Sequence, residues 1–216
     1  RLSYKHQFYL LSTCSVLLPE FQHRGWQQQR SWAGTEPVTP GALVLFLFTW
    51  PAILVNLLGW LIRYKMRYQI DTVFCLSLTE KVLLTPFARI LSMRVIWMEH
   101  LQIERWLFAS PLRLPYILWS RLVTVVTVVT AVKDQLVKLG VSAKQVHVIY
   151  NAVDVSKFTP SPSRAEDLTQ RFRVLFVGRL ASEKGIDDLL RAVQIVRQSV
   201  PQIQLNIVGE GSLRPT

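Results

Sequence analysis

A repeated alternation of strand-like and helix-like segments, starting at Ile70, is the feature that most constrains the fold. The strand-like runs are apolar and rich in β-branched residues, with few alternating polar positions: Asp71–Ser77, Met93–Met98, Leu122–Val129 and Val146–Tyr150. The segments between them have the composition of helices: Thr79–Leu91, residues 101–121 and Ala131–Leu139. Strands of this kind, separated by helices, indicate a parallel sheet covered on both faces. The predicted class is therefore α/β.

Local signals refine two of these helices. Thr85 followed by Pro86 predicts a restart inside Thr79–Leu91, because threonine caps helices and proline suits the first helical position. Thr130 is the expected cap of the helix Ala131–Leu139, and Gly140 is expected to end it.

A polar, proline-containing stretch at 151–171 interrupts the alternation. The pattern then restarts with a strand at Arg173–Gly178, a helix at Ile186–Ser199 and a strand at Gln204–Gly209. Such a break is typical of a domain boundary. We expect one domain over 1–150, a linker over 151–171 and the start of a second domain over 172–216.

The first part of the chain holds an uncharged apolar run at 42–62. About 20 apolar residues suffice to span a bilayer as a helix, and Arg63 and Lys65 follow at once. A small or polar stripe, including Thr49, Asn56 and Gly59, instead suits a helix that packs on protein, and Pro51 is expected to kink it. Three interpretations stay open: a helix of a soluble domain, a helix on the membrane surface, and a true span. Before this run we expect a strand at Phe8–Leu11.

The formal net charge of +11 implies anionic partners: nucleic acid, anionic lipid or phosphorylated substrates. No basic stripe with interleaved aromatics and no recognised module supports nucleic-acid binding. Cys14 and Cys75 form no C-x-x-C pair, so neither a metal site nor a disulfide framework is expected. They are expected to be two reduced core thiols of a cytoplasmic protein. We recognise no signal peptide, and both ends of the chain look cut.

The loop Gly178–Gly185 is the strongest candidate binding site. It lies between a strand end and a helix start, where open parallel sheets bind ligands and where free N–H groups attract anions. Arg179 and Lys184 add two cations, which together suit a diphosphate. The loop has neither the G-x-G-x-x-G nor the Walker pattern. The alternative is that the two cations merely pair with Glu183 and Asp187.

Motifs in this order resemble glycosyltransferase family 4, whose members have the GT-B fold of two Rossmann-like domains. In chain order, the first motif is Asn151, Val153, Asp154 and Phe158, which match an N-G-V-D-x-x-x-F pattern in which Ala152 replaces the glycine. The second is GRL-x-x-EKG, starting at Gly178, and the third is LNIVGEG, which follows a predicted helix. The resemblance covers Leu122–Gly211 well, Ile70–Ser120 loosely and the first 69 residues hardly at all. It implies an N-terminal domain that lacks its first strand and only the first β-α-β unit of the C-terminal domain.

The resemblance also implies roles for single residues. Arg179 and Lys184 match the pair that holds the diphosphate of the sugar nucleotide, next to Gly178. Gly209 and Gly211 match the turn that faces the nucleotide, although two glycines after a strand also suit an ordinary turn. His100 resembles the histidine near the donor sugar; the alternative is a structural hydrogen-bonding role. No metal or other cofactor is implied.

The implied function is retaining, metal-independent transfer of a sugar from a nucleoside-diphosphate sugar to a glycan, lipid or small-molecule acceptor, as in cell-envelope or glycolipid synthesis. The basic charge and the 42–62 run suit an anionic membrane surface, which implies a cytoplasmic protein at the inner face of the membrane. The family's glycine-rich loop is not found, and its paired glutamates would lie beyond Thr216, so we expect this chain alone to be inactive. The alternatives are a non-catalytic scaffold on a GT-B frame and a membrane-anchored protein.

Overall fold

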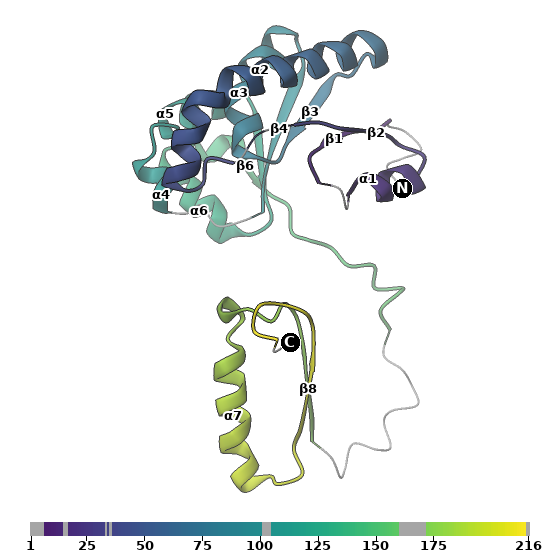
Figure 1. Ribbon diagram of the computed structural model, residues 1–216, viewed down its shortest axis with the longest axis vertical. Coiled ribbons are helices and arrows are strands. Elements are labelled where there is room, and N and C mark those ends of the chain that lie inside the picture. The colour runs from purple at the N-terminus through teal and green to yellow at the C-terminus, as the bar shows by residue number, and fades with distance from the viewer. Residues whose placement is uncertain are drawn as a thin grey trace. The chain divides into compact units, whose positions relative to one another are not determined.

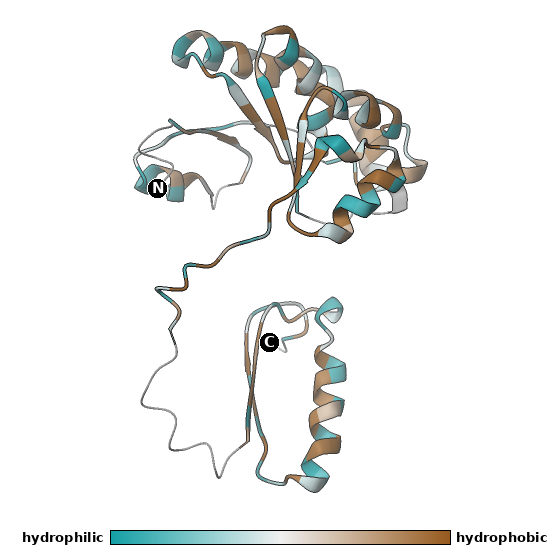
Figure 2. Cartoon of the chain, turned by 180° about the vertical axis from the view of Figure 1, so that it is seen from behind, coloured by the Kyte–Doolittle hydropathy of each residue, from teal (hydrophilic) through white to brown (hydrophobic). Residues whose placement is uncertain are grey.

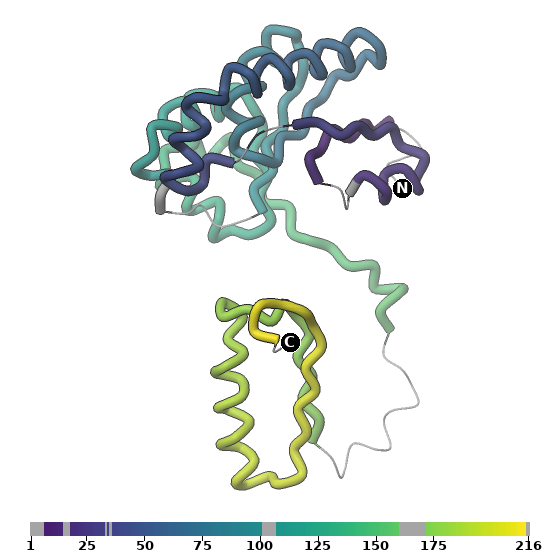
Figure 3. Tube along the Cα trace, in the orientation of Figure 1, coloured from purple at the N-terminus to yellow at the C-terminus, as the bar shows by residue number. Residues whose placement is uncertain are grey.

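The computed structural model describes residues 7–14, 17–32, 34, 36–100, 105–159 and 172–214. The chain divides into two compact units, Arg1–Ala152 and Val153–Thr216 (Figures 1 and 3).

Unit 1 is built on a four-stranded parallel sheet in the order β3-β4-β5-β6, which confirms the α/β prediction. Its strands are β3 (Thr72–Cys75), β4 (Arg94–Glu99), β5 (Thr124–Thr127) and β6 (Val146–Val148). The helices between and before them are α2 (Pro40–Tyr68), α3 (Leu78–Ile90), α4 (Arg105–Ala109), α5 (Arg113–Ser120) and α6 (Thr130–Leu139). The part of the expected helix that falls on residues 101–104 lies outside the described residues.

One face of this sheet forms the core. Cys75, Trp97 and Val125 are neighbours in register on adjacent strands, and all three are at most 1% exposed. They join one cluster with buried residues of α2, α3, α5 and α6. On the opposite face Phe74 is 56% exposed. The same face is more covered further along the sheet, where Val126 of β5 is 8% exposed.

Two of the local helix predictions are wrong. The α3 helix runs through Pro86 without a restart. Thr85 is fully buried, and its Oγ1 accepts a hydrogen bond from Trp97 Nε1 at 3.0 Å. Thr130 does not cap α6: Val129 occupies the cap position, and the Thr130 hydroxyl lies 2.9 Å from that of Tyr150. Gly140 ends α6 in a left-handed conformation (φ 119°), as predicted.

The N-terminal segment forms a second, two-stranded parallel sheet. It joins β1 (Tyr9–Ser12) to β2 (Gln27–Arg30), with α1 (Leu17–His23) between them. Tyr9 stacks on Tyr68 of α2, with ring centroids 4.5 Å apart. A cavity of about 1410 Å³ is lined by residues of β1, α2 and β3, among others. Among the described strands β3 pairs only with β4.

The α2 helix extends well beyond the apolar run, over 29 residues and through Pro51. It begins at Pro40 after Thr39, whose side chain accepts from the N–H of Ala42. In Figure 2 it is mostly brown, that is, hydrophobic. Within the described residues it is the one helix that is long and apolar enough to cross a membrane, by length and composition alone.

The packing of α2 corrects the expected contact face. An apolar stripe is buried instead of the small or polar one: Phe46, Ile53, Leu57, Leu61 and Tyr64. In the predicted stripe, Asn56 does bond to protein, donating to Ser31 Oγ and to the Trp32 carbonyl, but Gly59 is exposed. Since α2 supplies part of the core of unit 1, the packing favours a helix that lies on this unit over a free span.

The two cysteines differ. Cys75 is 1% exposed, and burial raises the pKa of its thiol well above the ordinary value. Cys14 is exposed, so the expectation of two core thiols is wrong for this residue.

Unit 2 contains one β-α-β motif. The parallel strands β7 (Arg173–Val177) and β8 (Gln204–Val208) pair from Arg173↔Gln204 to Val177↔Val208, and α7 (Ile186–Ser199) connects them. Figure 3 shows that the chain runs along β7, comes back along α7 and then enters β8. Both strands therefore end at the side of the unit where α7 begins.

Candidate active site

The predicted site residues fall in both units. His100 follows β4 in unit 1, whereas Gly178, Arg179, Lys184, Gly209 and Gly211 all lie at the strand ends of unit 2. The structure thus brings the five residues of unit 2 to one end of one β-α-β motif.

The loop after β7 leads into the N-terminus of α7. Gly178 N donates to Val208 O at 3.1 Å, and Leu180 N donates to Glu210 O at 2.8 Å, so the loop continues the pairing of the strands. A short 3-10 turn at Ser182–Lys184 follows, and Gly185 takes a left-handed conformation (φ 66°). Gly185 is also the cap residue of α7, and no side chain caps the helix. The first N–H groups of a helix without such a cap are open to an anion.

Arg179 and Lys184 are both on the surface of this loop. Arg179 Nη2 lies 3.1 Å from Glu183 Oε1, with side chains 73% and 55% exposed. This is the internal pairing that the sequence left open as an alternative, and an exposed pair of this kind is weak. Lys184 is exposed and forms no ion pair with Asp187 or with any other described residue. Both cations are therefore accessible to an anionic ligand, and their assigned role stays a prediction.

Gly209 and Gly211 are required by a close approach of two backbones. A Cβ on Gly209 would lie 1.8 Å from Gly178 O, and a Cβ on Gly211 would lie 2.2 Å from Leu180 O. No side chain fits at either position without a shift of the backbone. The glycines therefore hold the loop after β8 directly against the loop that carries Arg179.

His100 is exposed and directly follows the last residue of β4. The residue before it, Glu99, belongs to a buried polar cluster: its Oε1 lies 2.8 Å from Lys81 Nζ and accepts a 2.6 Å hydrogen bond from the Tyr116 hydroxyl. Burial is the main cause that raises the pKa of Tyr116 well above its ordinary value, and the neighbouring Glu99 carboxylate raises it further.

Sequence reasoning did not find Lys81 or Tyr116. The one signal was a lysine among apolar residues in the first half of Thr79–Leu91, where a helix that faces a sheet buries its side chains. A lone lysine in such a helix is usually expected at its surface.

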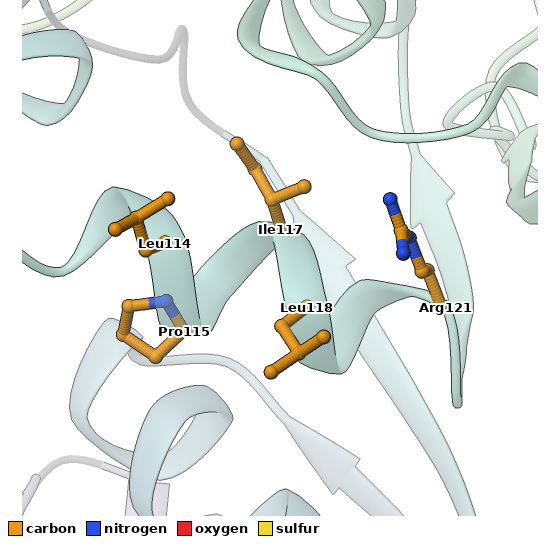
Figure 4. A pocket seen from close by; sticks show the side chains of 5 residues that line it. All are labelled: Leu114, Pro115, Ile117, Leu118 and Arg121. Carbon is orange, nitrogen blue, oxygen red and sulfur yellow. The ribbon is translucent and has the colours of Figure 1, made fainter.

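A pocket of about 430 Å³ on α5 is lined by Leu114, Pro115, Ile117, Leu118 and Arg121, as Figure 4 shows. It offers one charged group and no acid, base or nucleophile. In the described part of the chain no three His, Cys, Asp or Glu side chains gather as metal ligands do, and the expected independence of metal stays a prediction.

Two solved structures show the same fold. HepE from Anabaena, in complex with UDP, has a TM-score of 0.69 at 14% identity, over 95% of this chain and 61% of that one. A glycosyltransferase from Rickettsia africae has a TM-score of 0.64 at 13% identity, over 97% of this chain and 62% of the other. These likenesses confirm the GT-B type of α/β fold.

Two characterised proteins are similar over shorter segments. One of the subunits of the human phosphatidylinositol N-acetylglucosaminyltransferase is 34% identical over 85 residues, which is 39% of this chain and 17% of that protein. Glycogen synthase from Mycobacterium tuberculosis is 30% identical over 90 residues, or 41% of this chain and 21% of the enzyme. The matched segments thus span about a fifth of each relative.

The sequence profiles of two families match nearly the whole chain. "Glycosyl transferases group 1" matches residues 161–215. "Glycosyltransferase Family 4" matches residues 10–157, well over half of the 216 residues. The fold, the glycine-backed loop of unit 2 and this match agree, and the chain belongs to glycosyltransferase family 4.

Proposed function

We propose that the full-length protein transfers a sugar from a nucleoside-diphosphate sugar to a glycan, lipid or small-molecule acceptor, with retention of configuration and without a metal. The observation that carries the proposal is the pair of exposed cations, Arg179 and Lys184, on a loop that ends at the uncapped N-terminus of α7. Family membership and the UDP in the HepE complex support a nucleotide-sugar donor.

The two cations act on the leaving group. As the bond to the sugar breaks, negative charge grows on the diphosphate, and fixed positive groups and N–H dipoles stabilise it. Arg179 offers parallel N–H donors to the diphosphate, and Lys184 offers a mobile point charge. The first N–H groups of α7 add the positive end of the helix dipole. His100 takes the position near the donor sugar that the family resemblance gives it.

Donor binding gives the direct test. In the full-length protein, Arg179→Ala and Lys184→Ala should each weaken nucleoside-diphosphate binding by about 1.5 to 3 kcal/mol, the usual contribution of a hydrogen bond to a charged group. Isothermal titration calorimetry with UDP, GDP and ADP measures this and identifies the base. Arg197→Ala is the matched control, since Arg197 is an exposed cation in the last turn of α7, at the end of the helix far from the loop. Unchanged affinity in both loop variants would rule out the diphosphate assignment.

The surface of α2 supports a membrane-bound acceptor or a peripheral location. Directly opposite its buried stripe lies an exposed apolar stripe at helical spacing, formed by Val44, Phe48, Val55, Ile62 and Met66. Arg63 and Arg67 follow near its end, and the helix contains no acidic residue. A helix with an apolar outer face and neighbouring cations suits the surface of an anionic bilayer. We therefore place the protein in the cytoplasm, at the inner face of the membrane, in cell-envelope or glycolipid synthesis.

A further inference from the structure

A buried cation lies where β4 ends. Lys81 in the first half of α3 is 3% exposed, and its Nζ reaches two consecutive residues of β4. It donates to the Met98 carbonyl at 2.9 Å and to Glu99 Oε1 at 2.8 Å. The last two residues of the strand are thus fastened to α3, one through its backbone and one through its side chain.

A second helix holds the same carboxylate oxygen. The hydroxyl of Tyr116, on α5, donates to Glu99 Oε1 at 2.6 Å. The Tyr116 ring packs on Trp97, with centroids 4.7 Å apart, and Trp97 in turn donates to Thr85 of α3. Alternate residues of β4, Trp97 and Glu99, are therefore each tied to α3 and to α5 on one face of the sheet.

Burial of this ion pair calls for a reason other than stability. Moving a lysine and a glutamate out of water costs free energy that their attraction barely offsets, and apolar side chains of similar size often stabilise as well. A hydrogen-bonded pair adds directional restraint that apolar packing lacks. Here the restraint acts on the residue that immediately precedes His100, whose own side chain is exposed.

We infer that Lys81 and Tyr116 are positioning residues, which act through Glu99 to fix the direction in which His100 leaves the end of β4. The inference rests on the proposed role of His100 at the donor sugar. In this arrangement neither Lys81 nor Tyr116 touches the substrates. Their loss alters sugar transfer only to the extent that His100 takes part in it.

A double-mutant cycle in the full-length protein tests this. Lys81→Met and, as a milder change that keeps the ring, Tyr116→Phe are made in the wild type and in His100→Ala. Release of nucleoside diphosphate is followed with UDP-, GDP- and ADP-glucose. In the wild type, Lys81→Met should lower kcat roughly 10- to 100-fold, the effect of a displaced reacting group, and Tyr116→Phe less. In His100→Ala both changes should alter kcat less than about twofold, since coupled residues are not additive.

Further readouts separate positioning from folding. The affinity for the nucleoside diphosphate, a property proposed for the loop in unit 2, should stay unchanged in every variant. Arg94→Met is the matched control, because it breaks the exposed 3.0 Å pair with Asp71 at the opposite end of β4, and it should leave kcat unchanged. Equal losses with and without His100, or full kcat in both Lys81→Met and Tyr116→Phe, would overturn the inference. If instead His100→Ala itself keeps full kcat, it is the proposed role of His100 that fails, and the inference with it.

Discussion

At the scale of single residues, the candidate donor loop holds a cation that is already partly neutralised. Arg179 pairs with Glu183, four residues later, while Lys184 has no such partner among the described residues. An incoming diphosphate therefore competes with Glu183 for one guanidinium and meets Lys184 directly. The two residues should differ in how strongly their contribution depends on salt.

Glu183→Gln should tighten binding of the nucleoside diphosphate up to about fivefold, since it frees Arg179 and removes a negative charge, and exposed pairs are weak. The gain should shrink as salt rises, because exposed charges are screened. Titration calorimetry at low and physiological salt measures both. Glu20→Gln is the matched control, because it breaks an exposed pair of the same i,i+4 spacing with Arg24 in unit 1. Weaker binding of the nucleoside diphosphate in Glu183→Gln would contradict the competition.

Single residues also differ in whether their roles could be predicted from the sequence. Gly140 was predictable as the end of α6 because the signal is local, and the structure agrees. Thr85 has an equally clear local signal as a cap, yet it serves as the buried partner of Trp97, 12 residues later. Lys81 likewise depends on Glu99. The role of such a residue depends on a partner that is distant in sequence, and a local sequence pattern carries no information about that partner.

At the scale of elements, the amphipathic helices were predictable and the contacts between loops were not. The bounds of α7 agree with the sequence prediction because its periodicity is strong. The need for Gly209 and Gly211, by contrast, follows from the approach of two loops about 30 residues apart in sequence.

Gly209→Ala should therefore disrupt unit 2, since its Cβ would overlap the Gly178 carbonyl. We expect loss of nucleoside-diphosphate binding together with a lower melting temperature. Gly59→Ala in α2 is the matched change: a Cβ there meets nothing within 4 Å, so alanine should stabilise the folded state by about 0.5 to 1 kcal/mol. Differential scanning calorimetry and nucleotide titration separate the two results. Normal nucleoside-diphosphate binding in Gly209→Ala would show that the loops are not packed as described.

The exposed stripe of α2 makes a further prediction for an element. Phe48→Ser combined with Val55→Ser should lower binding to vesicles with about 30% phosphatidylglycerol severalfold, because both side chains are more than 70% exposed and apolar area drives interfacial binding. Co-sedimentation measures this at two salt concentrations. Ile195→Ser, an exposed apolar position on α7, is the control. Equal sedimentation of all variants would rule out α2 as the membrane-binding surface.

At the scale of the whole molecule, the two units have very different cores. Unit 1 contains nearly all of the buried apolar residues, whereas Ile186 is the one buried apolar side chain in the described part of unit 2. Two strands and one helix bury little area, and such small assemblies are marginally stable.

In this 216-residue chain, unit 1 should therefore stay folded at higher urea concentrations than unit 2, and thiol labelling distinguishes the two transitions. Both cysteines lie in unit 1, where Cys14 is exposed and Cys75 is buried with a raised pKa. With Ellman's reagent, Cys14 should react at once, and Cys75 only in the urea range where unit 1 unfolds. Far-UV circular dichroism should show an earlier transition that leaves Cys75 protected. Coincident transitions would mean that the units unfold together.

The buried stripe of α2 has a consequence during synthesis. Ile53, Leu57 and Leu61 belong to one core cluster with buried residues of β4, β5 and α6, all of which follow α2 in the chain. At ribosomal speeds these elements emerge several seconds later. Until then the nascent helix is apolar on both sides, and by length and composition alone it could cross a membrane. We therefore expect any contact of this chain with a membrane to depend both on how soon the sheet covers the buried side of α2 and on the apolar stripe that the sheet leaves exposed.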